Sequence, residues 1–417
     1  MGLKFRTIKQ NFNLGQIKLP AHLASISAIV LVWRVCLEFI SQTLAPAIQP
    51  SGGAESYISG VRFGLARWMR WDGTWYMTII NSGYHHHASA IIQQENIAFY
   101  PAFPILVRLI NDVTRIPYAY AGLILNFFLT IATCYFGYLL YATMKKKYGK
   151  HKTDHGFYVP VFFILAFPTA FFFAAFYSEA LLVLALTASL YFALNRRYWA
   201  AALFAGLATG SKIIGIIAAP TILILYIEQE NVFNHGFIEA IKKRWLTAAG
   251  LMITSVSGIV LYMAYLWVRF GNPLLSYDDN QAPGWGRKVG GFFITNISTY
   301  YQHIFDPKAY GSHINYLTNL SLAIVPIVAL LLVAYALYKR IWWMALYAFL
   351  MIILPLSTGS LMSVNRLALV LMPCFIGILA TEYSSTKRFY IWSIVALMAV
   401  AEIVLASFFL QGTYFIG

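Results

Sequence analysis

Residues 118–147 read YAYAGLILNFFLTIATCYFGYLLYATMKKK, a largely apolar run over 118–142 that is followed by Lys145, Lys146 and Lys147. A helix of about 20 apolar residues is long enough to cross the hydrocarbon core of a bilayer. A group of lysines at one end of such a run is typical of its cytoplasmic side. The stretch therefore predicts a transmembrane helix that ends in the cytoplasm.

Similar runs recur along the chain, whose 417 residues are 60% hydrophobic and only 11% charged. Helices are expected here because the runs do not alternate as barrel strands do, and because a helix satisfies its own backbone hydrogen bonds in lipid. The sequence predicts an all-α polytopic membrane protein with about eleven transmembrane helices in one integral domain, residues 1–417. The predicted spans are 22–45, 118–142, 157–175, 179–195, 199–211, 213–228, 246–269, 315–338, 341–356, 367–382 and 389–411.

The short spans between 157 and 228 contain residues that favour kinks or broken helices. Pro168 and Pro220 remove backbone donors, and glycines stand at positions 206, 210 and 215. The first span follows a polar, basic segment and is too long for the core of a signal peptide, so we expect it to be retained.

Basic clusters set the predicted orientation. With the N-terminus inside, the cytoplasmic side receives 145–147 with Lys150 and Lys152, 196–197, 242–244, 339–340 and 387–388. The formal charge of +15 then reflects topology, and no nucleic-acid partner is expected. The long loops 46–117 and 270–314 lie outside, with short turns near 174–180, 209–214 and 357–366.

An interfacial helix is predicted in the first outside loop, just before Asp72. Its apolar residues recur at helical spacing, and arginines are interspersed among them. The apolar set is Tyr57, Val61, Leu65 and Trp68, and the arginines are Arg62, Arg67 and Arg70.

Asp72 lies within the sequence RWDGTWY, residues 70–76, in that same loop. A carboxylate beside a bilayer is costly unless it is solvated, paired or used. One interpretation makes Asp72 a helix-start or turn residue before Gly73, with the tryptophans as interface anchors. The other makes it a catalytic group, and the residues alone leave both open.

Four further charged residues lie in outside turns or loops. Glu179 is either a helix N-terminal carboxylate with Ser178 as its cap, or a second acidic group in a site. Lys212 either extends to the surface or meets a phosphate, and Arg366 and Arg287 are placed similarly. Guanidinium groups match phosphate oxygens geometrically.

Metal and nucleotide sites receive little support. The adjacent residues His85, His86 and His87 cannot all point inward from one regular element, and no downstream spacing completes a site. Asp278 and Asp279 are better explained as part of a solvated loop than as metal ligands. The chain also lacks a glycine-rich phosphate loop followed by Lys-Ser/Thr. We therefore expect no metal and no cofactor.

Several segments, in order along the chain, resemble the PIG-V-type mannosyltransferases, that is, the GPI mannosyltransferase II family and its prokaryotic relatives within the GT-C membrane glycosyltransferase superfamily. They are RWDGTWY 70–76, SGY 82–84, AFYPAFP 98–104, FPTA 167–170, YSE 177–179, FGNP 270–273 with Gln281, WGR 285–287, and SVNR 363–366 before Pro373.

The resemblance implies a GT-C-like helical bundle that transfers a hexose, mannose by preference, from a polyprenyl-phosphate donor. The acceptor is a lipid or glycan hydroxyl on the non-cytoplasmic face of the membrane. Asp72 matches the first-loop aspartate that is the expected base. Two departures are Gly73, where eukaryotic members usually carry serine, and Lys212, where arginine is more usual. They leave the chemistry intact and leave the acceptor open between a GPI intermediate and that of a prokaryotic-type relative.

With a single base, the expected reaction is a direct displacement that inverts the anomeric carbon. Cations would stabilise the leaving lipid phosphate. The cations expected to do so are Lys212, Arg287 and Arg366, and the other expected substrate contacts are Trp71, Trp75, Tyr76, Glu179 and Trp285. For the aromatic residues, anchoring at the membrane interface is an alternative.

Two other functional classes remain open at this point. A transporter or lipid-linked sugar flippase would also have many spans, but it would place ionisable residues near mid-span and show related halves with broken helices. A non-catalytic membrane scaffold would tolerate charge-neutral substitutions at Asp72 and Arg287. The concentration of polar residues at one predicted face favours interfacial chemistry.

Overall fold

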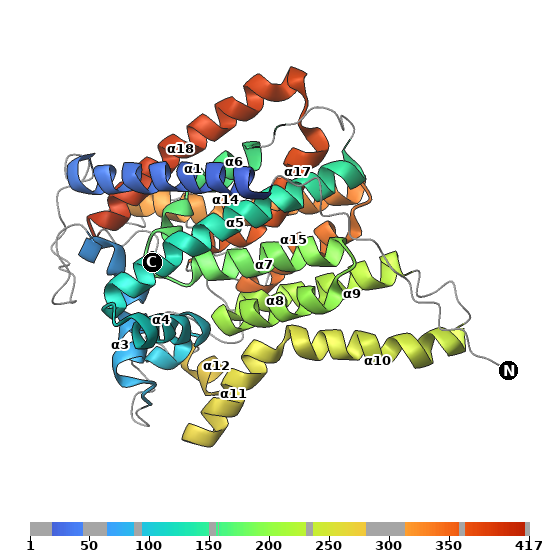
Figure 1. Ribbon diagram of the computed structural model, residues 1–417, viewed down its shortest axis with the longest axis horizontal. Coiled ribbons are helices and arrows are strands. Elements are labelled where there is room, and N and C mark those ends of the chain that lie inside the picture. The colour runs from blue at the N-terminus through green and yellow to red at the C-terminus, as the bar shows by residue number, and fades with distance from the viewer. Residues whose placement is uncertain are drawn as a thin grey trace.

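The computed structural model describes residues 19–44, 65–86, 94–149, 156, 158–230, 237–280, 313–357 and 363–412. Within these ranges every regular element is a helix, and no strand is present. The axes of most of the long helices are roughly aligned, and these helices form a bundle (Figure 1). The α-helices α3 and α4 lie together at one end of this bundle, which we call the site end (Figure 1).

The elements fall into three consecutive groups. The first comprises α1 Leu19–Phe39, η1 Ile40–Leu44, η2 Leu65–Met69, α3 Asp72–Ser82, η3 Asn96–Ala98, α4 Ala102–Thr114 and α5 Tyr118–Tyr148. The second comprises α6 Val159–Leu165, η4 Ala170–Phe173, α7 Glu179–Leu194, α8 Tyr198–Ser211, η5 Ile213–Ile217, α9 Ala218–Gln229, α10 Phe237–Ser255, α11 Ser257–Phe270 and α12 Leu275–Asn280. The third comprises α14 His313–Tyr338, α15 Trp342–Ser357, α16 Val364–Leu367, η9 Ala368–Leu371, α17 Met372–Glu382, η10 Ser385–Lys387 and α18 Arg388–Leu410.

The apolar helices support a membrane protein. Four helical stretches in the described residues are long and apolar enough to cross a bilayer: His22–Leu44, Tyr118–Tyr148, Val364–Glu382 and Ser385–Leu410. The bent pair Arg244–Ser255 and Ser257–Phe270 makes a fifth if it is one span, and four further apolar helices are shorter. The count of about eleven spans therefore stays a prediction.

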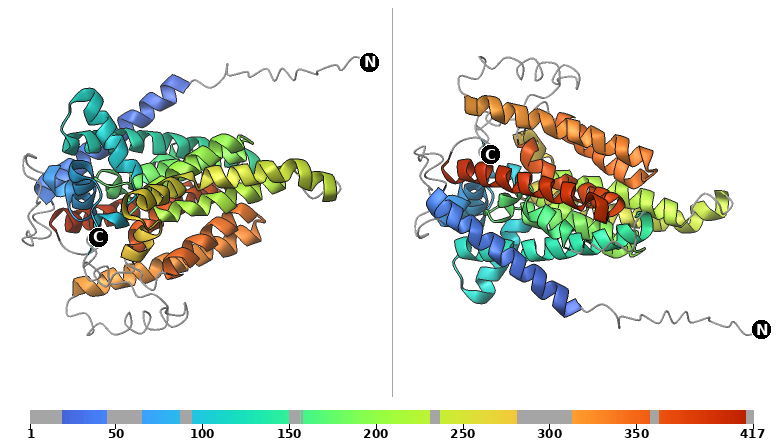
Figure 2. Two further views of the ribbon diagram at one scale, coloured as in Figure 1. Left: turned by 90° about the horizontal axis from the view of Figure 1, so that it is seen from below. Right: turned by 90° about the horizontal axis from the view of Figure 1, so that it is seen from above.

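The helix α7 lies at the centre of the bundle, between α5 and α8 (Figure 1). Nearly all of its residues are buried, which is typical of a helix that is apolar on every side. The pair α14 and α15 and the helix α1 lie on opposite flanks of this centre (Figure 2).

One predicted span, 157–175, is wrong as a continuous helix. The helix α6 ends at Leu165, and turns and the short η4 follow before α7 begins. Pro168 explains the break, because proline has no backbone N–H and disfavours helical geometry in the residue before it. The segment between α6 and α7 is mostly buried and leads back toward the site end.

The glycines of α8 pack helices together and do not break them. The helix α8 runs through Gly206 and Gly210 without interruption. A Cβ atom on Gly258 of α11 would lie 2.2 Å from the Gly206 carbonyl oxygen and 2.3 Å from the Gly210 nitrogen. The predicted span 246–269 is itself divided, because α10 and α11 meet at an angle of 59°.

Most of the predicted interfacial helix falls outside the described residues. Its last part, Leu65–Met69, is a short 3₁₀ turn in which Trp68 is fully buried. Trp68 donates from its ring nitrogen to Glu38 Oε2 of α1 at 3.1 Å. This part of the segment therefore packs into the protein.

Candidate functional site

Asp72 is the first residue of α3 and follows a strained residue. Trp71 has φ 56° and ψ −117°, a conformation that non-glycine residues rarely adopt. The Tyr177 hydroxyl accepts a hydrogen bond from the Asp72 N–H at 3.2 Å and donates to the Arg70 carbonyl at 2.9 Å. Strain of this kind costs about 1–3 kcal/mol and persists only where surrounding contacts impose it. Tyr177 thus fixes the turn that presents the Asp72 carboxylate.

The segment that carries Tyr177 is itself held from two sides. The Phe176 N–H donates to the Trp68 carbonyl at 2.8 Å, which joins the segment to η2. Asn126, buried in α5, donates from Nδ2 to the Tyr177 carbonyl at 2.9 Å and also bonds the Ala175 carbonyl. A polar group buried among apolar helices needs such partners. The segment then leads directly into α7, whose first residue is Glu179.

Arg366 reaches the same place from the C-terminal part of the chain. It belongs to the four-residue helix α16. The residue before this helix, Ser363, has a left-handed backbone conformation with φ 64°. The Arg366 guanidinium group lies over the rings of Phe172 at 5.6 Å and Tyr177 at 5.4 Å. Cations over aromatic faces are stabilised by the ring electrons. The position of Arg366 is therefore set by aromatic packing as well as by charge.

These elements bring four charged side chains into one chain of ion pairs. Arg366 Nη1 lies 2.5 Å from Asp72 Oδ2, and Arg366 Nε lies 2.9 Å from Glu179 Oε1. The same Glu179 oxygen pairs with Lys212 Nζ. Two carboxylates and two cations alternate, so the group is neutral in sum. The side chains are 3–15% exposed, and ion pairs at such depth are screened little by salt.

Asp72 is one of the more exposed members of this group. Its side chain is 14% exposed, compared with 3% for Glu179 and 8% for Arg366. Burial lowers the pKa of Lys212, and the neighbouring Glu179 opposes that shift. The Asp72 carboxylate is therefore both partly accessible to solvent and fixed in position. Glu179 is more deeply buried and pairs with both cations.

Two tyrosines surround the charges. The Tyr76 hydroxyl and Ser178 Oγ form a hydrogen bond of 2.7 Å. Burial, with nearby Glu179 and Asp72, raises the pKa of both Tyr76 and Tyr177 well above the usual range. Both hydroxyls therefore stay protonated and act as hydrogen-bonding groups, not as bases.

The structure brings together four of the residues singled out from the sequence: Asp72, Glu179, Lys212 and Arg366. Ser178 stands at the N-cap of α7, but its hydroxyl bonds Tyr76 and makes no capping bond. Outside this group, Arg34 and Glu38 form an ion pair of 3.3 Å within α1.

The aromatic candidates lie around α3. Trp75 is partly buried and stacks on Phe99 with ring centres 6.1 Å apart. Tyr76 is buried close to Glu179 and Asp72, and Trp71 is partly buried next to Asp72 in the chain. Trp285 and Arg287 lie outside the described residues.

No three His, Cys, Asp or Glu side chains gather as metal ligands within the described ranges. His86 Nδ1 lies 2.8 Å from Glu95 Oε2. Asp278 and Asp279 lie in α12, where Asp278 accepts from Asn272 at 2.8 Å and Asp279 is buried, so the expectation of a solvated loop is wrong for Asp279. His87 lies outside the described residues.

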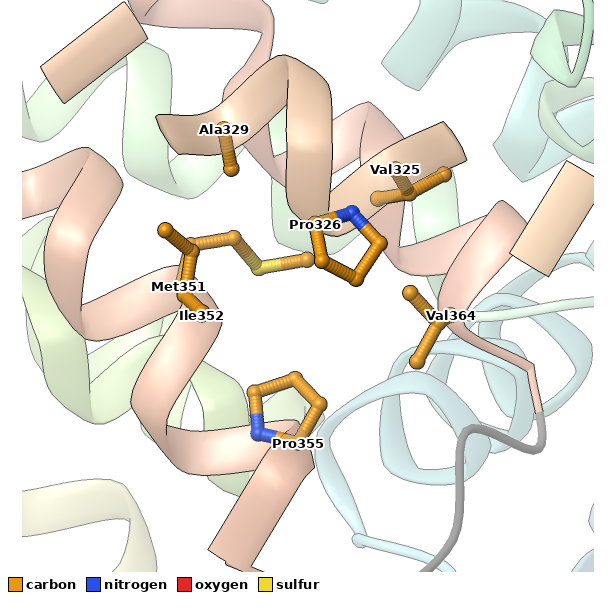
Figure 3. A pocket seen from close by; sticks show the side chains of 7 residues that line it. All are labelled: Val325, Pro326, Ala329, Met351, Ile352, Pro355 and Val364. Carbon is orange, nitrogen blue, oxygen red and sulfur yellow. The ribbon is translucent and has the colours of Figure 1, made fainter. Parts of the chain in front are cut away.

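A small apolar pocket adjoins the segment that carries Arg366. Pro326 of α14 and Pro355 of α15 face it, and Val364, two residues before Arg366, closes one side (Figure 3). The lining residues are Val325, Pro326, Ala329, Met351, Ile352, Pro355 and Val364. All are apolar, so these side chains offer no hydrogen-bonding group for a sugar or a phosphate.

The residues that sequence reasoning missed are those that hold the charged group. Tyr177 stands within the quoted motif, yet its two backbone contacts depend on a segment far away in sequence. Asn126 did offer a signal, since it is an amide within an otherwise apolar span.

The comparison with protein families agrees with this picture. The family described as Mannosyltransferase (PIG-V) matches residues 28–339, about three quarters of the chain. The match includes Asp72, Glu179 and Lys212 and ends before Arg366. No curated protein matches the chain. Because the match covers well over half of the sequence, the chain belongs to the PIG-V mannosyltransferase family, whose activity is glycosyl transfer.

Proposed function

We propose that this protein transfers mannose from a polyprenyl-phosphate donor to an acceptor hydroxyl at the site end of the bundle, with Asp72 as the general base. One observation carries the proposal. The Asp72 carboxylate is partly exposed at the start of α3 and is held 2.5 Å from Arg366, a cation suited to a leaving phosphate.

The reaction is a direct displacement. The acceptor oxygen gives its proton to Asp72 and forms a bond to the anomeric carbon. The bond from that carbon to the phosphate oxygen breaks, and its electron pair leaves with the lipid phosphate. A single base and one displacement invert the anomeric centre, so a β-linked donor gives an α-linked product.

In the free protein, the Asp72 carboxylate is paired with the Arg366 guanidinium. A bound donor phosphate, a phosphodiester with one negative charge, competes for the same guanidinium, and the second negative charge that develops as the sugar leaves strengthens the attraction. When Arg366 turns to the phosphate, Asp72 loses its partner and becomes available to an acceptor hydroxyl. The donor thus activates the base when it binds.

Glu179 and Lys212 support this exchange. Glu179 forms an ion pair with Arg366 Nε. The Arg366 side chain can therefore stay in place when its Nη1 changes partner. Lys212 balances the second carboxylate and adds positive charge near the leaving group. Arg287 and Trp285 remain proposed substrate contacts.

The position of the charges favours a transferase over the transporter or flippase alternative. Asp72 and Glu179 begin helices, Lys212 follows the end of α8, and Arg366 lies in the short α16. All four stand at helix ends and not in the middle of a long span. Interfacial chemistry needs charges there, whereas a translocation path needs them at mid-span.

Mass spectrometry of lipid-linked and surface glycans tests the proposal in cells. Cells that express the protein are compared with cells that lack it and with cells that express Asp72→Asn. We expect a mannose-bearing glycan that is present only with the wild-type protein. A profile that stays the same in all three would contradict the proposed activity, and restoration by Asp72→Asn would remove Asp72 as base.

A further inference from the structure

A second group of cations lies where η1 and η2 meet, apart from the chain of ion pairs. It consists of Arg67 and Arg70 on and after η2, with Ser41 of η1 beside them. Arg67 Nη1 donates to the Ser41 carbonyl at 2.6 Å. We call this group the arginine pair.

The arginine pair has donors that are buried and unsatisfied. Arg70 Nε and Nη1 are shielded from solvent and have no hydrogen-bond partner among the described residues, and the same is true of Ser41 Oγ. A buried donor without a partner is destabilising, and more so when it belongs to a charged group. These atoms are therefore placed for a partner that is not part of the described chain.

No carboxylate in the described ranges neutralises Arg70. Glu38, the acidic residue of the neighbouring α1 segment, already pairs with Arg34 and accepts from Trp68 and Gln42. Burial and the adjacent Arg67 charge lower the pKa of Arg70. Two like charges side by side are repulsive unless an anion lies between them.

We propose that the arginine pair binds the phosphate of a membrane-lipid headgroup, with the unsatisfied Arg70 Nε and Nη1 among the donors to its oxygens. A guanidinium carries five N–H donors, which suit the several oxygens of a phosphate. The pair follows the end of the apolar stretch His22–Leu44, where lipid headgroups meet a transmembrane helix.

The bound headgroup has a direct route to Asp72. The Arg70 carbonyl accepts from the Tyr177 hydroxyl, which also bonds the Asp72 N–H. Fixing the Arg70 side chain therefore stabilises the strained Trp71 turn. This site goes beyond the proposed transfer reaction, and its binding test needs no sugar transfer.

The test uses purified full-length protein and native mass spectrometry or thermal shift with four probes. They are phosphatidic acid, a polyprenyl monophosphate, inorganic phosphate and diacylglycerol. We expect both phosphate lipids to bind the wild type and diacylglycerol to bind weakly. Arg70→Gln should weaken phosphatidic acid about tenfold or more, because charged hydrogen bonds to its phosphate are lost. Polyprenyl monophosphate should weaken less, because the cations of the proposed catalytic site can also bind it.

Three variants serve as controls. Arg108→Gln, at an exposed arginine of α4, should bind as the wild type does. Asp72→Asn should also keep full binding of phosphatidic acid, which separates this site from the proposed catalytic one. Arg70→Lys keeps the charge and loses the planar set of guanidinium donors, so it should bind at an intermediate level.

Four results would overturn the proposal. They are equal binding by the wild type and Arg70→Gln, an equal loss in Arg108→Gln, binding of inorganic phosphate without either phosphate lipid, and a gain of binding in Glu55→Gln. Glu55 stands between η1 and η2 in the sequence, outside the described residues. A gain on its replacement would mean that the Glu55 carboxylate is the anion. Without lipid, Arg70→Gln should melt no lower than the wild type, because it removes an uncompensated charge.

Discussion

Arg366 Nη1 and Asp72 Oδ2 are 2.5 Å apart although 294 positions separate the two residues in sequence. The contact joins α16 to the start of α3 and closes the chain of ion pairs that continues to Glu179 and Lys212. It makes the position of the proposed base dependent on the C-terminal part of the chain.

Replacing Arg366 with glutamine should affect both stability and turnover. Asp72 and Glu179 would keep their charges and lose their shared partner, and breaking a buried pair on one side costs about 3–5 kcal/mol. Transfer should fall by about 100-fold or more, because a preorganised donor to the leaving group is lost. Thermal unfolding and single-turnover assays would measure the two effects.

Arg115→Gln is the matched control, since Arg115 is exposed at the end of α4. An Arg366→Gln protein with wild-type turnover would show that the guanidinium takes no part in the reaction.

Glu179 and Lys212 should be coupled energetically. Lys212→Met alone leaves Glu179 with Arg366, and Glu179→Gln alone leaves Lys212 buried without a carboxylate. A double-mutant cycle on the free energies of unfolding should give a coupling energy of about 0.5–3 kcal/mol. Strict additivity would indicate that the ion pair does not form in the folded protein.

Tyr177→Phe should loosen the Trp71 turn. The substitution keeps the ring under Arg366 but removes the hydroxyl that bonds the Asp72 N–H and the Arg70 carbonyl. We expect a loss of about 1–3 kcal/mol in stability from the unsatisfied backbone groups. Turnover should fall while donor affinity changes less, because the base is displaced. Tyr135→Phe, on α5, is the control, and an equal effect there would assign the loss to general packing.

Gly258→Ala should separate α11 from α8. The added Cβ would lie within 2.3 Å of two backbone atoms of α8, so the helices must move apart. Overpacking of this kind costs about 1–3 kcal/mol. Val260→Ala, at an exposed position of the same helix, should change the melting temperature far less. Similar melting of both variants would contradict the close contact.

Many helix boundaries could be predicted from the sequence because they depend on local composition. The predicted span at 118–142 begins where α5 begins, at Tyr118, and α7, α8 and α18 lie within a residue or two of their predicted ranges. The segment 157–175 failed because its residues are as apolar as a span, yet Pro168 and a series of buried phenylalanines form turns. Hydropathy does not distinguish a buried turn from a membrane helix.

The charged residues of the site could also be predicted, but not their pairing. Asp72, Glu179, Lys212 and Arg366 are conspicuous in an apolar chain. Which of them meet depends on how distant helices pack. The strained residue was hidden for a similar reason, since the sequence places a glycine at 73 while the positive φ falls on Trp71. Tyr177 imposes it through contacts that only the fold creates.

The most direct test of the central claim is single-turnover transfer by purified Asp72→Asn with a polyprenyl-phosphate mannose donor and a lipid extract as acceptor source. Donor binding is measured in parallel, and Asp112→Asn, at an exposed aspartate of α4, is the control. We expect Asp72→Asn to bind the donor and to transfer mannose about 100-fold to 10,000-fold more slowly than the wild type. Transfer at the wild-type rate by Asp72→Asn would contradict the assignment of Asp72 as the base.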